Sequence, residues 1–337
     1  MNQYYTEVEL PELEWKIDHQ SKLMMVGSCF AENIGIRMQE LKFQVDMNPF
    51  GIVYNPLSVS RSLKLLMEGK QYTANDLFEH QGVWHSFDHH SRFSSTNAAE
   101  ALDRMNEQLK TSAEHLKNSD YLIVSLGTSW VYEWKPTGRI VSNCHKLPAA
   151  DFKRFRLTPG EIVDELKELM TALWKFNPKL KILLTVSPIR HWKDGAHGNQ
   201  LSKAALLLAV DRLVTGFGTE QCAYFPSYEI MMDELRDYRF YTPDMVHISN
   251  QSIEHIWQKF GSLMFEVETQ QLMKRLSKLS KAVGHRPFNR NAEAYEKFLF
   301  YNLKEVEDLL KKFPFLNLSK EKEHFKRELD GYQRRGK

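Results

Sequence analysis

The chain has 337 residues, of which 42% are hydrophobic and 26% charged, and its formal net charge is +2 at pH 7. This length accommodates one large domain, or one domain with an appendage, and the composition is ordinary for a globular protein that buries a sizeable core. A net charge this close to zero gives no ground for a nucleic-acid partner. The longest conspicuous apolar run, AALLLAV, falls far short of the roughly 18 residues of a membrane span. We therefore predict neither a nucleic-acid nor a membrane partner.

The cysteines and the N-terminal segment indicate in which cellular compartment the protein is expected. Cys29, Cys144 and Cys222 form no CxxC pair and show no spacing typical of a zinc site. An odd, sparse set of cysteines favours free thiols in a reducing compartment over a disulfide framework. The first 18 residues contain acidic residues throughout and no apolar core, so they do not resemble a secretory signal. We expect a cytoplasmic protein.

Apolar and amphipathic segments alternate along the chain. Five short apolar segments predict buried strands at residues 22–27, 43–48, 121–127, 181–187 and 222–227. Amphipathic stretches predict helices at about 30–41, 57–69, 95–117, 159–175, 200–215 and 256–267. This alternation predicts an α/β fold with a parallel sheet covered on both faces. Right-handed crossovers then collect the loops that follow the strands at one edge of the sheet, where ligands bind in such folds.

Two insertions interrupt the pattern. Residues 82–95, GVWHSFDHHSRFSS, predict a lid or a pocket wall rather than sheet. Residues 131–155, which follow the third predicted strand, are expected to contain a small hairpin.

The C-terminal segment differs in composition from the rest of the chain. After about Glu268 it becomes rich in Lys, Glu, Leu and Phe with helical periodicity, which predicts a sheet-containing domain at residues 1–268 and a helical appendage at 269–337. Residues 270–337 contain 17 Lys/Arg and 9 Asp/Glu, and the appendage is therefore basic. Such a segment either attracts a polyanionic partner or presents a solvated helical face, and the interleaved acids favour the second interpretation.

Chemistry is expected first at the turn after the opening strand, in LMMVGSCFAENIG. A helix that begins at this turn directs free backbone N–H groups at the Ser28 side chain, and its positive end favours a developing anion. A serine needs a nearby base to attack, and YTPDMVHISNQ, after the last strand, offers Asp244 and His247. At this spacing in a turn, the carboxylate can reach Nδ1–H of the histidine while Nε2 faces outward, as a general base requires. Taken alone, a small residue in a turn and a capping Asp beside a surface His are also common structural features.

Two further loops leave the same predicted edge. NPFG places Gly51 where the backbone can approach a ligand closely, and LGTSW offers Gly127 with the hydroxyls of Thr128 and Ser129. Small residues and fixed donors are what an oxyanion hole needs.

Six motifs in this order resemble those of the GSCFA family: VGSCFAENIG, NPFGIVYNP, SLGTSWVY, SNCHK, TVSPIRHWKDGAH and DMVHIS. The resemblance covers about residues 20–260. The family is placed with the SGNH/GDSL hydrolases, so the resemblance implies a three-layer αβα sandwich with a flavodoxin-like, parallel five-stranded sheet. By position, Ser28 resembles the nucleophile and Gly51 the oxyanion glycine, while Asp244 and His247 resemble the Asp-x-x-His pair. The backbone N–H groups of Ser28 and Gly51 are then the expected oxyanion donors.

The third SGNH motif departs from the usual pattern. That motif normally offers an Asn side chain where this chain has Ser129, whose hydroxyl is shorter and rotates more freely. Ser129 is expected to be a weaker third donor. Asn143 or His145 of SNCHK is a candidate for the missing donor.

Cys29 is the rival nucleophile, because a thiol is activated at a helix N-terminus. Adjacent side chains in a turn point in different directions, so only one of Ser28 and Cys29 can face His247. The Asp-His arrangement resembles that of serine esterases and favours Ser28.

The loop at residues 82–95 gathers Trp84, His85, Asp88, His89 and His90. A metal site is a weak interpretation, because two histidines are adjacent and no helical i,i+4 pair is evident. A wall that binds a polar substrate through Trp84 and His89 fits better, and no metal is expected.

The loop after the fourth predicted strand, SPIRHWKDGAHGNQ, carries His191 and Lys193. We predict that both contact a polar or anionic substrate, although a solvated loop fits the pattern equally well. Tryptophans at or near the edge loops suit either a sugar ring or simple packing.

No GxxxxGK, HExxH or GxSxG motif occurs, so no nucleotide chemistry and no cofactor is expected. We predict a serine esterase that hydrolyses a small acyl ester, such as an acetyl group on a carbohydrate or polar metabolite, through an acyl-enzyme on Ser28. An O-acyltransferase would result if an alcohol replaced water. The rival from another class is a non-catalytic protein that keeps the hydrolase fold to bind a ligand or partner. The sequence leaves the oligomeric state open.

Overall fold

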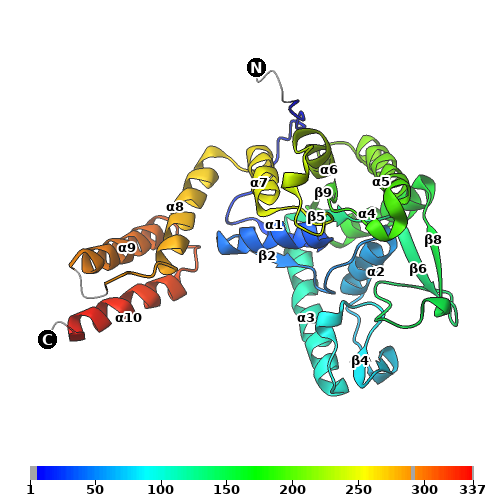
Figure 1. The fold of residues 1–337 in the computed structure, drawn as a ribbon, viewed down its shortest axis with the longest axis horizontal. Helices are drawn as coiled ribbons and strands as arrows, with labels where there is room; N and C mark the ends of the chain where they lie inside the picture. The colour runs from blue at the N-terminus through cyan, green and yellow to red at the C-terminus, as the bar shows by residue number, and fades with distance from the viewer. Residues whose placement is uncertain (1–5, 290–292, 336–337) are drawn as a thin grey trace. The chain divides into compact units, whose positions relative to one another are not determined.

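The main sheet has five parallel strands in the order β10-β9-β5-β1-β2 (Figure 1). The computed structural model describes residues 6–289 and 293–335. The strands are β1 (Lys22–Gly27), β2 (Gln44–Met47), β5 (Tyr121–Leu126), β9 (Lys181–Val186) and β10 (Cys222–Phe225). β1, β5 and β9 are buried along almost their whole lengths, as expected for strands covered on both faces. The predicted α/β fold with five parallel strands is confirmed.

Helices cover both faces of this sheet (Figure 1). They are α1 (Cys29–Glu40), α2 (Pro56–Met67), α3 (Ala98–Asn118), α4 (Pro159–Phe176), α5 (Gly195–Phe217), α6 (Ser227–Glu229) and α7 (Asn250–Met264). The start of α2 follows from local chemistry. Asn55 caps α2 by accepting the N–H of Ser58, and Pro56 occupies the first turn, where a missing N–H costs nothing.

The alternation of side chains along the strands divides the core into two layers. Val26, Val124 and Leu184 belong to one large apolar cluster with α2, α3, α4 and α5. On the opposite face, Phe225 of β10 packs edge-to-face against Phe260 of α7, with ring centroids 5.4 Å apart. Two apolar layers around one sheet make the predicted three-layer sandwich.

The insertions contain more sheet than predicted. β3 (Phe78–His80) and β4 (Val83–His85) form an antiparallel hairpin, so the prediction that residues 82–95 contain no sheet is wrong at its start. Gln81 and Gly82 both have positive φ and form the two-residue turn that favours such a hairpin. The hairpin expected in residues 131–155 belongs to a three-stranded sheet of β7 (Arg139–Val141), β6 (Trp130–Trp134) and β8 (Phe152–Arg156), in that order.

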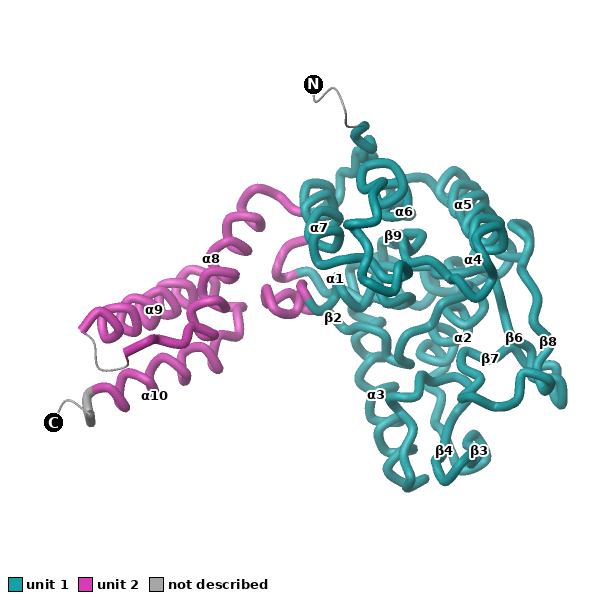
Figure 2. The backbone as a smooth tube through the Cα atoms, viewed as in Figure 1, with its two compact units in different colours: residues 1–16, 21–36, 45–264 teal, residues 17–20, 37–44, 265–337 magenta. Residues whose placement is uncertain are grey.

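A second compact unit contains residues 17–20, 37–44 and 265–337 (Figure 2). Its helices are α8 (Val267–Val283), α9 (Glu293–Lys312) and α10 (Ser319–Arg335). They enclose an apolar cluster of their own, which includes Leu276, Leu299 and Phe325. The unit thus takes in two short segments from the N-terminal part of the chain as well as the predicted helical appendage. Across the described ranges, no helix is long and apolar enough to cross a membrane.

Candidate active site

The turn between β1 and α1 is built on a glycine that nothing larger can replace. Gly27 has φ of 138°, and a Cβ added there would lie 2.1 Å from the carbonyl oxygen of Ser125 on β5. The Gly27 N–H donates to Oδ1 of Asn48 at 2.9 Å in a buried hydrogen bond. The end of β1 is therefore pressed against β5 and tied to the loop that follows β2.

Ser28 is fully engaged in this turn. Its N–H donates to the carbonyl of Ser125 at 3.1 Å, and its Oγ lies 2.9 Å from Oγ of Ser125. The same Oγ accepts the N–H of Phe30 at 3.2 Å, in the first turn of α1. Only 1% of Ser28 is exposed. In this arrangement the hydroxyl satisfies a free N–H of the helix start and joins β1 to β5.

Cys29, the first residue of α1, is more accessible than Ser28. Its Sγ lies 3.9 Å from the hydroxyl of Tyr54. Burial raises the pKa of the thiol. The contact with Tyr54 lowers this pKa, but by a smaller amount. In the part of the chain that the structure describes, the Cys29 N–H has no hydrogen-bond acceptor in a neighbouring loop or strand. A thiol and a free N–H group thus occupy the same helix start.

Loops from three strands meet beside Cys29. The carbonyl of Tyr54, which follows β2, accepts the N–H groups of Gly127 at 2.7 Å and Thr128 at 3.1 Å, both of which follow β5. The Tyr54 ring meets His191, which follows β9, edge to face with centroids 5.5 Å apart. A Cβ on Gly127 would lie 3.1 Å from Nε2 of His191. A side chain at position 127 would therefore be crowded by the His191 ring and by the backbone of Tyr54.

Asp244 and His247 form a compact turn before α7. Nδ1 of His247 lies 2.6 Å from Oδ2 of Asp244, and both side chains are about half exposed. Asp244 Oδ1 also accepts a hydrogen bond from Thr242 Oγ1 at 2.6 Å and one from the His247 N–H at 3.0 Å. The hydrogen bonds from Thr242 and His247 hold the pKa of the Asp244 carboxyl well below its usual range. The carboxylate therefore stays ionised and fixes the orientation of the imidazole.

The turn with His247 is tied to the loop after β9. Arg190 donates from Nη2 to the carbonyl of Met245, and its guanidinium lies 4.8 Å from the ring centre of Tyr241. His191 has its pKa lowered to about 3, chiefly by burial and in part by the charges of neighbours that include His247. Between the described residues, no hydrogen bond joins His247 to Ser28 or Cys29.

The predicted oxyanion donors are already hydrogen-bonded. Gly51 donates its N–H to the carbonyl of Asn48 at 2.7 Å, and its φ is 81°. A Cβ on Gly51 would lie 2.2 Å from Cβ of His90, so glycine is needed for packing. Ser129 is fully buried, and its Oγ donates to Oγ of Ser202 at 3.1 Å.

Several predicted substrate contacts lie instead in a polar network around β4 and β7. His89 is fully buried, stacks on Phe50 with ring centroids 4.7 Å apart, and has its pKa lowered to about 3 by burial. His145 donates from Nε2 to the carbonyl of Ser86 at 2.8 Å, and burial lowers its pKa to about 4. Asn143 accepts the N–H of His145 at 2.9 Å. These contacts give the three side chains structural roles.

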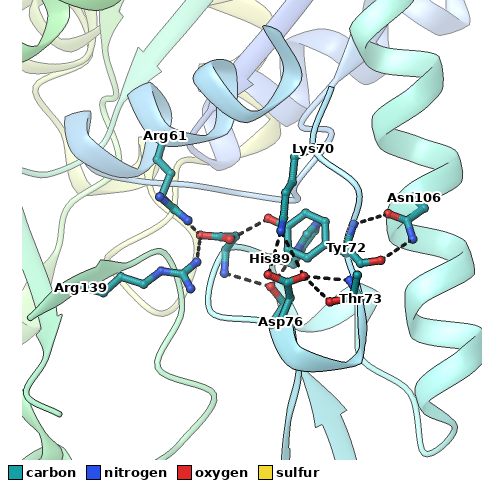
Figure 3. A network of polar contacts seen from close by, with 10 residues as sticks. Arg61, Lys70, Tyr72, Thr73, Asp76, His89, Asn106 and Arg139 are labelled. Carbon is teal, nitrogen blue, oxygen red and sulfur yellow. Dashed lines mark hydrogen bonds and ion pairs between the residues drawn. The ribbon is translucent and has the colours of Figure 1, made fainter. Parts of the chain in front are cut away.

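The same network holds a buried carboxylate. Asp88 accepts hydrogen bonds from Arg61 at 2.7 Å and from the hydroxyl of Tyr72 at 2.7 Å, and it also pairs with Arg139 (Figure 3). Burial favours the neutral carboxyl, but the charges of Arg139 and Arg61 outweigh it and hold the pKa of Asp88 at about 2. Over the described ranges, no group of three or more His, Cys, Asp or Glu side chains is placed to hold a metal ion.

Two predicted residues have other contacts. The backbone N–H of Trp84 donates to the carbonyl of Ser95 at 2.7 Å. Lys193 donates from Nζ to the hydroxyl of Tyr132 at 2.9 Å, which ties the loop after β9 to β6.

Two residues of the site were not predicted. Tyr54 belongs to the motif NPFGIVYNP, in which only Gly51 was predicted to have a functional role. Lys203 directly precedes the apolar run AALLLAV of α5. A lysine next to such a run is the sequence feature that could have indicated a buried amine. Lys203 is fully buried and donates from Nζ to the carbonyls of Gly127 at 2.7 Å and Ser187 at 2.6 Å. Burial lowers its pKa to about 7.

Comparison with known families agrees with the motifs. The GSCFA family matches residues 22–260, and the family described as GSCFA domain protein, C-terminal domain, matches residues 276–331. The chain belongs to the GSCFA family. The sequence matches no curated protein.

Solved structures offer distant similarity only. One is a carbohydrate esterase family 3 from Talaromyces cellulolyticus, with 10% identity and a TM-score of 0.37, covering 75% of this chain and 98% of that one. Another is the acetyl xylan esterase Est2A from Butyrivibrio proteoclasticus, with 11% identity and a TM-score of 0.36, covering 76% of this chain and 64% of that one.

Proposed function

We propose that this GSCFA protein is an acyl-ester hydrolase whose general base is His247, oriented by Asp244. The observation that supports this most directly is the 2.6 Å contact between His247 Nδ1 and an exposed, ionised Asp244, which leaves Nε2 as the proton acceptor. A carboxylate that orients an imidazole in this way is what base-assisted nucleophilic attack requires. The turn between β1 and α1 supplies the nucleophile.

Of the two candidate nucleophiles, the contacts favour Cys29 over the predicted Ser28. The Ser28 hydroxyl is 1% exposed and holds β5 and the start of α1 together, so attack would require breaking these bonds. Cys29 is partly exposed, and its own N–H is available to an oxyanion. Ser28 remains the alternative, with the same base and the same sequence of steps.

The proposed reaction has two steps. Nε2 of His247 takes the thiol proton as Sγ of Cys29 bonds to the ester carbonyl carbon, and the carbonyl becomes an oxyanion near the Cys29 N–H. The carbon–oxygen bond to the alcohol then breaks, and the imidazolium returns the proton to the leaving alcohol. Water, deprotonated by the same imidazole, then attacks the thioester carbon. The carbon–sulfur bond breaks, the carboxylic acid leaves, and the imidazolium returns the proton to Sγ of Cys29. An alcohol in place of water would make the protein an O-acyltransferase.

A small acyl group on a polar alcohol is the substrate class that we propose, with an O-acetylated carbohydrate as its first member. Trp192 supports a sugar, because its ring is 52% exposed in the loop after β9, next to His191. Exposed aromatic rings are apolar platforms with a polar edge, which suits a sugar face. The rival proposal is a non-catalytic protein that binds such a ligand or a partner. In that protein the exposed Asp244–His247 pair would have no nucleophile within reach.

Hydrolysis of p-nitrophenyl acetate by the purified chain tests this proposal. We expect turnover that is lost in His247→Gln and strongly reduced in Asp244→Asn. Cys29→Ala should abolish acylation of the protein, detected by mass spectrometry after rapid acid quenching, while Ser28→Ala should retain it. The reverse pattern for the last two variants would assign the attack to Ser28. Full turnover in His247→Gln would refute the proposed hydrolase.

A further inference from the structure

We infer that Tyr54 is a catalytic residue of this site: its phenol hydroxyl donates a hydrogen bond to the oxyanion, beside the N–H of Cys29. The inference rests on the proposed hydrolase function with Cys29 as nucleophile. Tyr54 would then have the role of side-chain oxyanion donor, which was predicted from the sequence for Ser129.

The position of the hydroxyl relative to the sulfur carries the inference. Tyr54 OH lies 3.9 Å from Sγ of Cys29, and this is the hydroxyl's only hydrogen-bonding contact with the described residues. An oxyanion formed on an acylated Cys29 is two bonds away from Sγ. A hydroxyl this close to the sulfur is therefore within hydrogen-bonding reach of the oxyanion and has no competing acceptor other than the thiol.

The backbone around Tyr54 holds the hydroxyl in place before any substrate binds. Its carbonyl accepts two N–H groups, from Gly127 at 2.7 Å and Thr128 at 3.1 Å. The next residue, Asn55, is the cap of α2, and the ring is flanked by His191 with an interplanar angle of 83°. Donors that do not reorganise during the reaction stabilise a developing oxyanion most effectively.

The protonation state of the phenol suits this role. Burial, followed by the nearby Cys29 and Glu32, raises the pKa of Tyr54 above its ordinary value of 10.0. Other titratable or charged groups lie around the site: Arg92 pairs with Glu32 at 3.2 Å, His90 lies against Gly51, and His191 lies against the Tyr54 ring. The phenol keeps its proton throughout the pH range of an esterase assay and can always donate.

The other candidate donors are committed elsewhere. The Ser28 N–H donates to Ser125 and the Gly51 N–H to Asn48. The hydroxyl of Ser129 is fully buried against Ser202. Unlike these donors, the Tyr54 hydroxyl contacts the proposed nucleophile itself and bonds to no other group in the described residues.

Tyr54→Phe tests the inference, because it removes the hydroxyl and keeps the ring and the backbone carbonyl. We expect kcat for p-nitrophenyl acetate to fall on the order of 10²–10³-fold, as for loss of one oxyanion donor, with KM little changed. Alkylation of Cys29 by iodoacetamide forms no oxyanion, so its rate should fall far less than kcat, because only the small lowering of the thiol pKa by Tyr54 is lost. Tyr228→Phe is the matched control, since it removes a hydroxyl that bonds to Gln200 at 2.6 Å. It should leave kcat unchanged.

Each other outcome has a distinct meaning. If Tyr54→Phe keeps wild-type kcat while His247→Gln loses activity, Tyr54 is not an oxyanion donor and the hydrolase proposal stands. If alkylation of Cys29 slows as much as turnover, the hydroxyl acts on the thiol, and the inference is overturned. If wild-type protein is never acylated, the proposed function fails, and the inference fails with it.

Discussion

Lys203 provides a sharp test of how the edge of the sheet is held together. It is fully buried, donates to the carbonyls of Gly127 and Ser187, and has its pKa lowered by burial from 10.5 to about 7. Between these two pKa values the unfolded chain binds a proton that the folded protein does not, so the free energy of unfolding rises with pH. From pH 7 to pH 9 the gain from this one group is about 2 kcal/mol, and below pH 6 the contribution no longer changes.

The perturbation is Lys203→Met, which keeps an unbranched chain and removes both the charge and the two hydrogen bonds. Urea unfolding of wild type and variant at pH 6, 7, 8 and 9 gives the difference in unfolding free energy at each pH. We expect this difference to move by about 2 kcal/mol in favour of the wild type between pH 7 and pH 9, and to stay nearly constant below pH 6. Neighbouring groups do not titrate in that window, because the pKa of His191 is about 3 and burial raises that of Tyr228. A difference that stays constant from pH 7 to pH 9 would refute the argument that Lys203 is buried with a lowered pKa.

Three further perturbations have expected outcomes. Gly27→Ala should destabilise the fold by more than about 3 kcal/mol, seen as a lowered Tm in circular dichroism, because the new Cβ would lie 2.1 Å from a carbonyl oxygen of β5. Asp88→Asn should cost about 3–5 kcal/mol in urea unfolding, since two arginines would lose their buried carboxylate; an unchanged midpoint would contradict this. The pKa of His89 is about 3 in the folded protein and 6.5 in the unfolded chain. Below pH 6.5 the chain therefore takes up a proton when it unfolds, and its stability falls on acidification. We expect a loss of roughly 2 kcal/mol from pH 7 to pH 5 that His89→Gln removes, measured as the change in urea midpoint.

The fold could be predicted because the apolar runs of a buried parallel sheet are unmistakable. Residues 121–127 and 181–187 each contain a short apolar run, and the structure has strands there within one residue. The β3–β4 hairpin was missed for the opposite reason. Its strands have only three residues each, and they meet at Gln81-Gly82, which is not among the dipeptides that usually indicate a two-residue turn.

The site could be predicted only as far as the edge of the sheet. The order of strands and helices was enough to expect that the loops with Ser28, Gly51 and His247 lie on one side. Exposure and hydrogen bonding were not predictable, because they depend on which partner in another loop a side chain meets. Ser125, for example, looks like one more residue of a buried strand, yet it engages both the N–H and the hydroxyl of Ser28.

The polar contacts at this edge join the loops in nearly the order of the strands in the sheet. Asn48 of the loop after β2 binds the end of β1, and the carbonyl of Tyr54 binds the loop after β5. Lys203 then joins the loop after β5 to the end of β9, and Arg190 joins the loop after β9 to the turn with His247. Backbone groups in buried loops must find partners, and here each loop finds them in its neighbour. Because every link is a buried or backbone-directed hydrogen bond, the position of the base depends on residues that would never touch a substrate. A site built this way is rigid before substrate binds, which is the condition under which fixed donors such as Tyr54 lower an activation barrier.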